Sequence, residues 1–140
     1  MKKLSLLIAL GSFVFLSIAK PSINVTAFES YSRQMQDLSA RYIADKKFDY
    51  ANKAIEKWIE SYNTLSANEK GQYNDVYSAI MYQQACTYTQ TNELYKALKS
   101  LKESVRTGFS NSDQALNDPN LKELSSYTEF KKIIQSISKS

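Results

Sequence analysis

Residues 82–101 read YQQACTYTQTNELYKALKSL, and this stretch decides the fold that we expect. Tyr88 follows Ala85 by three residues, and after a polar turn Ala97 stands in the next apolar run. Because alanine side chains lack bulk, two helix backbones can approach closely at Ala85 and Ala97, and the ring of Tyr88 can lie across the contact. The stretch therefore predicts two antiparallel helices in close contact.

Residues that interrupt helices are scarce along the whole chain. There are three glycines and two prolines among 140 residues, and apolar residues recur at spacings of three and four. Such spacing is typical of amphipathic helices and not of strands. We therefore expect an all-α protein made of antiparallel helical hairpins with a C-terminal capping helix. The predicted helices span residues 30–44, 45–65, 66–90 and 91–107, with short helical pieces from 112 and 118 and a last helix from 126.

Several helix ends carry recognisable signals. Two segments, at 66–69 and 126–129, have the Ser-x-x-Glu pattern of a capping box. Further polar residues stand where an N-cap is expected: Asp45 for the second helix, Thr91 or Asn92 for the fourth, and Asp118 in the tail. Ser112 and Asp113 can start one helical turn that reaches Leu116. Gly108 can end the fourth helix in a left-handed conformation. Gln84 interrupts an apolar face, so it needs a hydrogen-bond partner if it is buried.

The N-terminal residues have the layout of a secretory signal peptide. Lys2 and Lys3 precede an apolar run that ends in small residues before Ala19. We expect a leader at 1–19 that is cleaved after Ala19, with cleavage after Ala27 as the second candidate. The alternative is a retained membrane anchor, because the apolar run approaches the length of about 20 residues that spans a bilayer.

A leader of this kind predicts export, to a periplasm or to the medium. Residues 20–29 then form a flexible lead-in, and residues 30–140 form one helical domain. Losing the leader lysines lowers the formal net charge of +4, so we do not expect a nucleic-acid partner. Contact with a membrane is expected only if the leader is retained.

The chain offers few groups for catalysis. It contains no histidine, and its single cysteine, Cys86, has no lysine or arginine within a helical turn. The commonest general base and metal ligand is therefore missing, and nothing nearby lowers the pKa of the thiol. We interpret Cys86 as a small core residue. We expect no enzymatic activity, no cofactor and no metal.

The second hairpin and the tail resemble the tetratricopeptide repeat, in the form that ends an array. In that form a glycine–aromatic pair and an Asp-Pro-x-Leu segment follow the last hairpin, as 108–109 and 118–121 do here. The resemblance covers residues 34–134. It implies hairpins at 30–65 and 66–108 and a capping tail at 109–140.

The two implied hairpins align with each other. Ala51 corresponds to Ala97, which lies 46 positions further on, whereas the usual repeat has about 34 residues. The extra residues fall between Leu65 and Val76, so we expect them to lengthen the third helix.

The resemblance also implies which surface binds a partner, namely the inward face of the first helix in each hairpin. The residues at those positions are Gln36, Ala40, Ile43, Ala79, Tyr82, Cys86 and Thr89. Tyr82 is the strongest candidate for a contact, since tyrosine offers area and a polar tip; the alternative is that it packs against the tail. The lysine–asparagine pair with which some relatives bind a C-terminal carboxylate is missing from this face.

A basic stripe lies on the fourth predicted helix. Its members are Lys96, Lys99, Lys102 and Arg106. Such a stripe is typical of a solvated helix end, and the alternative is a surface for an acidic partner or anionic lipid heads.

These observations predict a protein-interaction adaptor that binds a protein or peptide and has no chemistry of its own. The alternatives are a structural or accessory subunit of an envelope assembly or homodimer, and an inhibitor of an exported enzyme.

Overall fold

The computed structural model describes residues 25–137, so the predicted leader and the cleavage site after Ala19 lie outside the described residues. In chain order the helices are α1 (Val25–Ala44), α2 (Phe48–Asn63), α3 (Ala67–Gly71), α4 (Asn74–Gln90), α5 (Leu94–Arg106), α6 (Ser112–Asn117), the 3-10 helix η1 (Pro119–Ser126) and α7 (Thr128–Ile137). No strand occurs within this part of the chain, which confirms the all-α class. None of the helices described has the length and apolarity needed to cross a bilayer.

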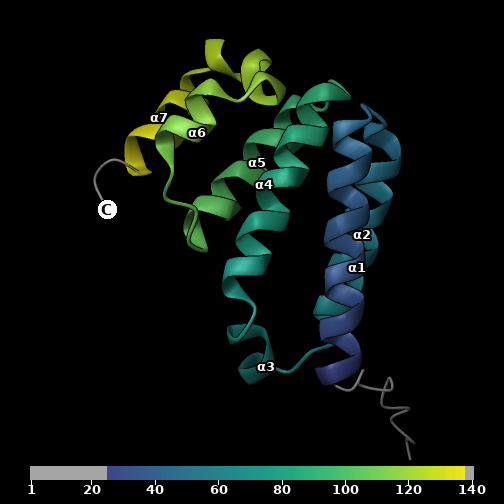
Figure 1. The fold of residues 1–140 in the computed structure, drawn as a ribbon. Helices are drawn as coiled ribbons and strands as arrows, with labels where there is room; N and C mark the ends of the chain where they lie inside the picture. The colour runs from purple at the N-terminus through teal and green to yellow at the C-terminus, as the bar shows by residue number, and fades with distance from the viewer. Residues whose placement is uncertain (1–24, 138–140) are drawn as a thin grey trace, which may run out of the picture.

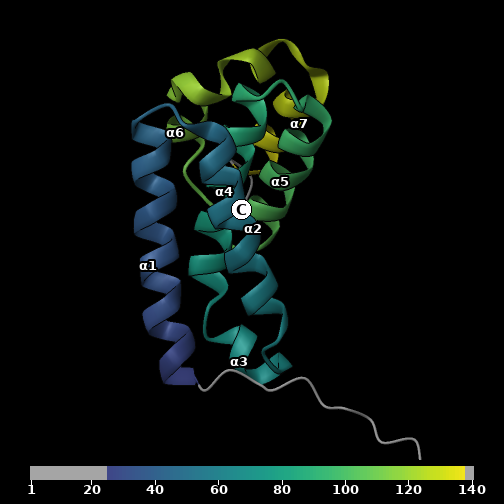
Figure 2. The ribbon, with the colours of Figure 1, turned by 90° about the vertical axis from the view of Figure 1, so that its right-hand side faces the viewer.

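The helices form a stack with α4 in the middle (Figure 1). α1 packs along α2 and α4 packs along α5, and a short turn joins the members of each pair. α2 and α1 contact one side of α4, whereas η1 contacts α4 and α7 contacts α5 on the other side. Figure 2 shows α3 at one end of the molecule and the segment from α6 to η1 at the opposite end.

Burial on both sides distinguishes α4 from its neighbours. One core cluster lies between α1, α2 and α4, and it contains Phe28, Ile55, Trp58, Tyr62, Leu65, Ile80 and Met81. The other lies between α4, α5 and the tail, and it contains Tyr82, Ala85, Cys86, Ala97, Leu101, Ala115, Leu121, Leu124, Phe130, Ile133, Ile134 and Ile137. α7 contributes its whole apolar face to this second cluster, which is why the tail covers α5.

Polar side chains of α4 are paired with neighbouring helices. The hydroxyls of Ser78 and Ser104 each donate to the other's backbone carbonyl, at 2.8 and 2.7 Å. Ser100 donates to the Gln84 amide oxygen at 2.9 Å, so the buried glutamine has the partner that it needs. Thr87 donates to Asn52 on α2. These bonds orient α4 against both neighbours, and no fully buried side-chain nitrogen or oxygen within the described part of the chain lacks a hydrogen-bond partner.

The turns after α1 and α4 have the same geometry. Lys46 and Asn92 both adopt a positive φ, of 58° and 62°, and they stand 46 positions apart. The amide of the next residue donates in each case to a tyrosine carbonyl five residues back, Lys47 to Tyr42 at 2.7 Å and Glu93 to Tyr88 at 2.8 Å. This left-handed closure satisfies carbonyls at the helix end.

Because of this turn geometry, the N-caps predicted for α2 and α5 are wrong. Asp45, Thr91 and Asn92 do not cap the following helices, because all three belong to the turns that end the preceding ones. α2 and α5 begin after Lys47 and Glu93, neither of which makes a side-chain cap bond.

The tail confirms some predicted caps and corrects others. Asp118 accepts from the Asn120 amide and Pro119 begins η1, as expected. α6 begins at Ser112, as expected, and Asn111 caps it by accepting a hydrogen bond from the Gln114 amide. α7 begins at Thr128, so the predicted capping box at 126–129 does not open it. The predicted capping box at 66–69 is present: the Ser66 side chain accepts from the Glu69 amide, and the Glu69 carboxylate accepts from the Ser66 amide.

Two helix boundaries differ from the prediction because of an aromatic cluster. α1 begins at Val25, so part of the range 20–29, expected as a flexible lead-in, is helical. Starting there buries Phe28 against Trp58 and Tyr73, with ring centroids 5.8 and 4.8 Å apart.

The predicted helix at 66–90 is interrupted near Gly71. Tyr73 is non-helical, with φ −114° and ψ 18°, and it directs its ring edge-on to Phe28. Because glycine is also a poor helix former, the break costs little intrinsic helix stability. The extra residues thus form the separate helix α3.

We predict that Ala97→Leu destabilises the fold by about 1 to 3 kcal/mol. Ala85 and Ala97 are both fully buried where α4 meets α5, and the isobutyl group that replaces the Ala97 methyl group must push this contact apart. Urea unfolding followed by circular dichroism measures the change. Tyr95→Leu, on the exposed face of the same helix, is the control and should change stability by no more than about 0.5 kcal/mol. Equal effects of the two variants would contradict close packing at Ala97.

Candidate functional site

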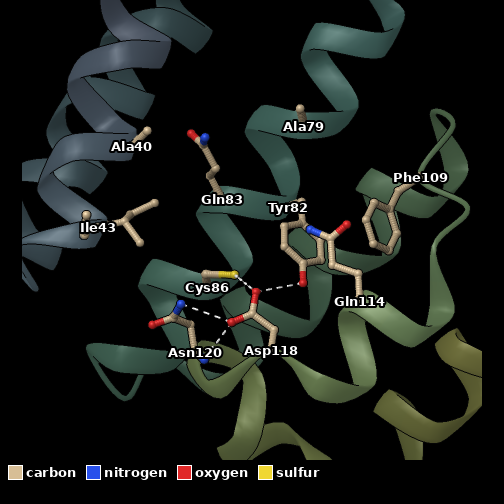
Figure 3. Close-up of a pocket in the computed structure, with 11 residues that line it drawn as sticks. Ala40, Ile43, Ala79, Tyr82, Gln83, Cys86, Phe109, Gln114, Asp118 and Asn120 are labelled. Carbon is tan, nitrogen blue, oxygen red and sulfur yellow. Dashed lines mark hydrogen bonds between the residues drawn. The ribbon is translucent and has the colours of Figure 1, made fainter.

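A concave pocket lies between α1, α4 and the tail (Figure 3). We call it the Asp118 pocket, and its volume is about 460 Å³. Its lining consists of Ala40, Ile43, Ala44, Ala79, Tyr82, Gln83, Cys86, Phe109, Gln114, Asp118 and Asn120.

Helix periodicity brings the α4 residues of the pocket together. Ala79, Tyr82, Gln83 and Cys86 follow each other at spacings of three, one and three, so they occupy one face of α4. α1 supplies small or half-buried apolar residues opposite them. Because Ala40 and Ala79 are both small and exposed, the space between the two helices stays open.

The carboxylate of Asp118 connects the tail to α4. Its Oδ2 accepts from the Tyr82 hydroxyl at 2.9 Å and from the Cys86 thiol at 3.6 Å. Its Oδ1 accepts from the backbone and side-chain amides of Asn120, at 2.8 and 3.0 Å. Four donors therefore surround one carboxylate and fix the start of η1 at the edge of the pocket.

Tyr82 forms a rigid wall of the pocket. Its ring stacks on Phe109, with centroids 4.5 Å apart and planes inclined by 23°. Burial raises the pKa of its hydroxyl, and the neighbouring Cys86 and the hydrogen bond to Asp118 raise it further. Tyr82 is therefore a neutral hydrogen-bond donor at any physiological pH, with its position set from two sides.

Cys86 is buried, with 3% of its surface exposed. Burial raises the pKa of the thiol, and the negative charge of Asp118 adds to the effect. Because only a thiolate is a strong nucleophile, we expect this cysteine to react slowly at neutral pH.

The chemistry of the lining favours binding of uncharged groups. Asp118 carries its one formal charge, and the remaining members are apolar, amide, hydroxyl or thiol groups. Gln83 accepts from Ser39 through its amide oxygen at 2.8 Å, so its amide nitrogen remains available as a donor. Across residues 25–137, no three His, Cys, Asp or Glu side chains gather so as to hold a metal ion.

The structure brings together most of the residues expected at the binding face. Ile43, Ala79, Tyr82 and Cys86 line the Asp118 pocket, and so does Ala40. The other two expected residues do not line it. Gln36 donates to the Ser32 side chain and carbonyl within α1, and Thr89 is buried and donates to the Ala85 carbonyl.

The tail contributes residues that the sequence did not assign to the site. Phe109, Gln114, Asp118 and Asn120 lie up to 38 positions from Tyr82 in the chain. Tyr82 packs against the tail, as the alternative interpretation expected, and it also lines the pocket. Gln83 was detectable from the sequence, since it is four residues after Ala79 on the same helix face.

No protein-family model, curated protein or solved structure matches the chain.

We predict that Cys86 reacts with a thiol reagent such as DTNB at pH 8 about a hundredfold more slowly in the folded protein than in protein unfolded with guanidinium chloride. The reason is that burial raises the pKa of the thiol and covers its sulfur. Absorbance of the released chromophore measures both rates. Rapid labelling of the folded protein would contradict the buried, protonated thiol.

We also predict that Asp118→Ala lowers the free energy of unfolding by about 1 to 3 kcal/mol, because it leaves the donors of Tyr82, Cys86 and Asn120 without their acceptor. Asp113→Ala is the control, since this side chain is exposed on the neighbouring α6 and should cost no more than about 0.5 kcal/mol. Chemical unfolding measures both, and similar losses would contradict a special role for Asp118.

Proposed function

We propose that this protein is an exported helical-repeat module, similar in design to the tetratricopeptide repeat, that binds a protein or peptide partner through the Asp118 pocket. In this proposal the α1–α2 and α4–α5 pairs are the two repeats and the segment from α6 to α7 is the terminal cap. The matched turns at Lys46 and Asn92 support the repeat, since independent turns need not share φ, hydrogen bonds and spacing. A terminal cap is what a short array needs to cover its last apolar face.

The observation that carries the binding proposal is a concave pocket with rigid walls. Tyr82 is fixed by Phe109 on its face and by Asp118 at its hydroxyl, so an incoming group finds the wall already in place. Preformed surfaces of this kind lose little conformational entropy on binding. An aromatic wall and a volume of about 460 Å³ suit one or two side chains of a peptide.

The lining also indicates what kind of segment fits. Ile43 and Ala79 offer contact to an aliphatic or aromatic side chain, and the amides of Gln83 and Gln114 offer hydrogen bonds to its backbone. The Asp118 carboxylate disfavours an acidic residue at this point. We therefore propose an apolar anchor in a neutral or basic segment.

A second candidate is a subunit of a homodimer or larger assembly. The outer side of α1 and α2 has no helix packed on it among the described residues, and it forms a cavity of about 400 Å³ lined by Met35, Leu38, Tyr42, Tyr50, Lys53, Ala54, Glu56, Lys57 and Glu60. Tyr50 is 57% exposed there. An apolar floor with charges of both signs at its edge is suited to a permanent protein contact.

The binding proposal predicts that the full chain selects peptides with an apolar anchor from a random display library. Ala79→Trp fills the pocket from an exposed position and should weaken their binding at least about tenfold, or 1.4 kcal/mol, in isothermal titration. Ala67→Trp, exposed on α3, is the control and should leave binding unchanged.

Failure to enrich any peptide, or equal binding by Ala79→Trp, would contradict the proposal. Size-exclusion chromatography separates the two candidates, because a binding module is expected to be monomeric at micromolar concentration. An obligate dimer disrupted by Tyr50→Glu would favour the assembly subunit.

A further inference from the structure

A second cavity lies between α4 and α5 and shares no residue with the Asp118 pocket. We call it the α4/α5 groove, and its volume is about 700 Å³. Its lining consists of Tyr77, Met81, Gln84, Tyr88, Lys96, Lys99, Ser100, Lys102, Glu103 and Arg106. The residues from α4 follow each other at spacings of four, three and four, so they form one continuous strip along that helix.

The groove has an aromatic and apolar floor that is held in place. Tyr77 stacks on Tyr62, with ring centroids 4.8 Å apart, and its hydroxyl donates to Glu103 at 3.4 Å. Gln84 lies between the two tyrosines; it is buried, and its amide oxygen accepts from the Ser100 hydroxyl at 2.9 Å. An apolar side chain entering here meets the tyrosine rings and the Met81 side chain.

The rim of the groove is strongly cationic. Three lysines and one arginine line it against a single carboxylate, that of Glu103. Lys99 makes no ion pair among the described residues, and Lys102 only a long one, at 3.8 Å to Glu129. Lys96 pairs with Glu93 and lies 5.2 Å from the centre of the Tyr88 ring.

These lysines are available to a ligand. Lys96 and Lys102 are more than half exposed, and exposed ion pairs contribute little to stability, so an incoming carboxylate can compete for them. Arg106 is the exception, because it holds Glu103 through two bonds of 2.7 and 2.6 Å. Arg106 therefore neutralises the charge of Glu103, the one carboxylate that lines the groove.

From this arrangement of an aromatic floor beneath exposed lysines we propose that the α4/α5 groove binds an acidic protein segment that inserts an aromatic or aliphatic side chain. The lysines on α5 attract carboxylates, and Tyr77, Met81 and Tyr88 bury the inserted side chain. A lipid headgroup layer would use the charges but not the floor, since a flat anionic surface places no side chain at depth. The inference does not depend on the function proposed for the Asp118 pocket.

Fluorescence anisotropy of a labelled octapeptide of glutamates with one central phenylalanine, titrated with the full chain, tests the proposal. Lys99→Glu combined with Lys102→Glu should weaken binding at least about tenfold, because it reverses two charges at the rim. Lys122→Glu combined with Lys131→Glu is the matched control: the net charge changes equally, at exposed positions outside the groove, and binding should stay within about threefold. Replacing the peptide phenylalanine with alanine should also weaken binding several-fold.

Three results would overturn the proposal. The first is no binding of the peptide at 50 mM salt. The second is an equal loss in both double variants, which would mean attraction by overall charge alone. The third is that the protein binds phosphatidylserine vesicles but not the peptide, and that Lys99→Glu combined with Lys102→Glu abolishes the vesicle binding. This result would mean that the rim of the groove contacts a membrane surface.

Discussion

Ser78 on α4 and Ser104 on α5 exchange two hydrogen bonds, each hydroxyl donating to the other residue's backbone carbonyl. Such an exchange requires the two backbones to lie close together, and the buried Ala85 and Ala97 make this approach sterically possible. α4 is in turn the helix that both core clusters share. Its spacing from α5 therefore fixes where the first helix pair and the tail can pack.

The same helix places two different surfaces on the molecule. One strip of α4 lines the Asp118 pocket, where the charged group is a carboxylate already bonded to four donors. The next strip lines the α4/α5 groove, where the charges are mainly lysines. Neighbouring residues of a helix point to different faces, so a single rigid helix can line two separate surfaces. Here one surface disfavours acidic groups and the other attracts them.

Several local patterns in the sequence were confirmed, whereas the capping box at 126–129 and the N-caps at Asp45 and Asn92 were wrong. The capping box at Ser66, the left-handed Gly108 and the Asp118–Pro119 start of η1 all depend on neighbours within four positions. Predictions failed where a distant ring changed the local preference. Tyr73 leaves the helical conformation to meet Phe28, which lies 45 positions earlier and itself extends α1 toward the N-terminus.

The sequence by itself determined the all-α class and the central pair of close helices, because helix periodicity places residues three and four apart on one face. Five of the residues that the repeat resemblance placed on the binding face line the Asp118 pocket. Only the tertiary structure decided that Phe109, Asp118 and Asn120 complete the pocket, since no helical period links them to α4. It also decided the role of Asp118, which the sequence marks as a cap and the fold uses in addition to bind Tyr82 and Cys86. A carboxylate can accept more hydrogen bonds than the amides of its own turn donate. The packing of distant segments decides which further donors reach it.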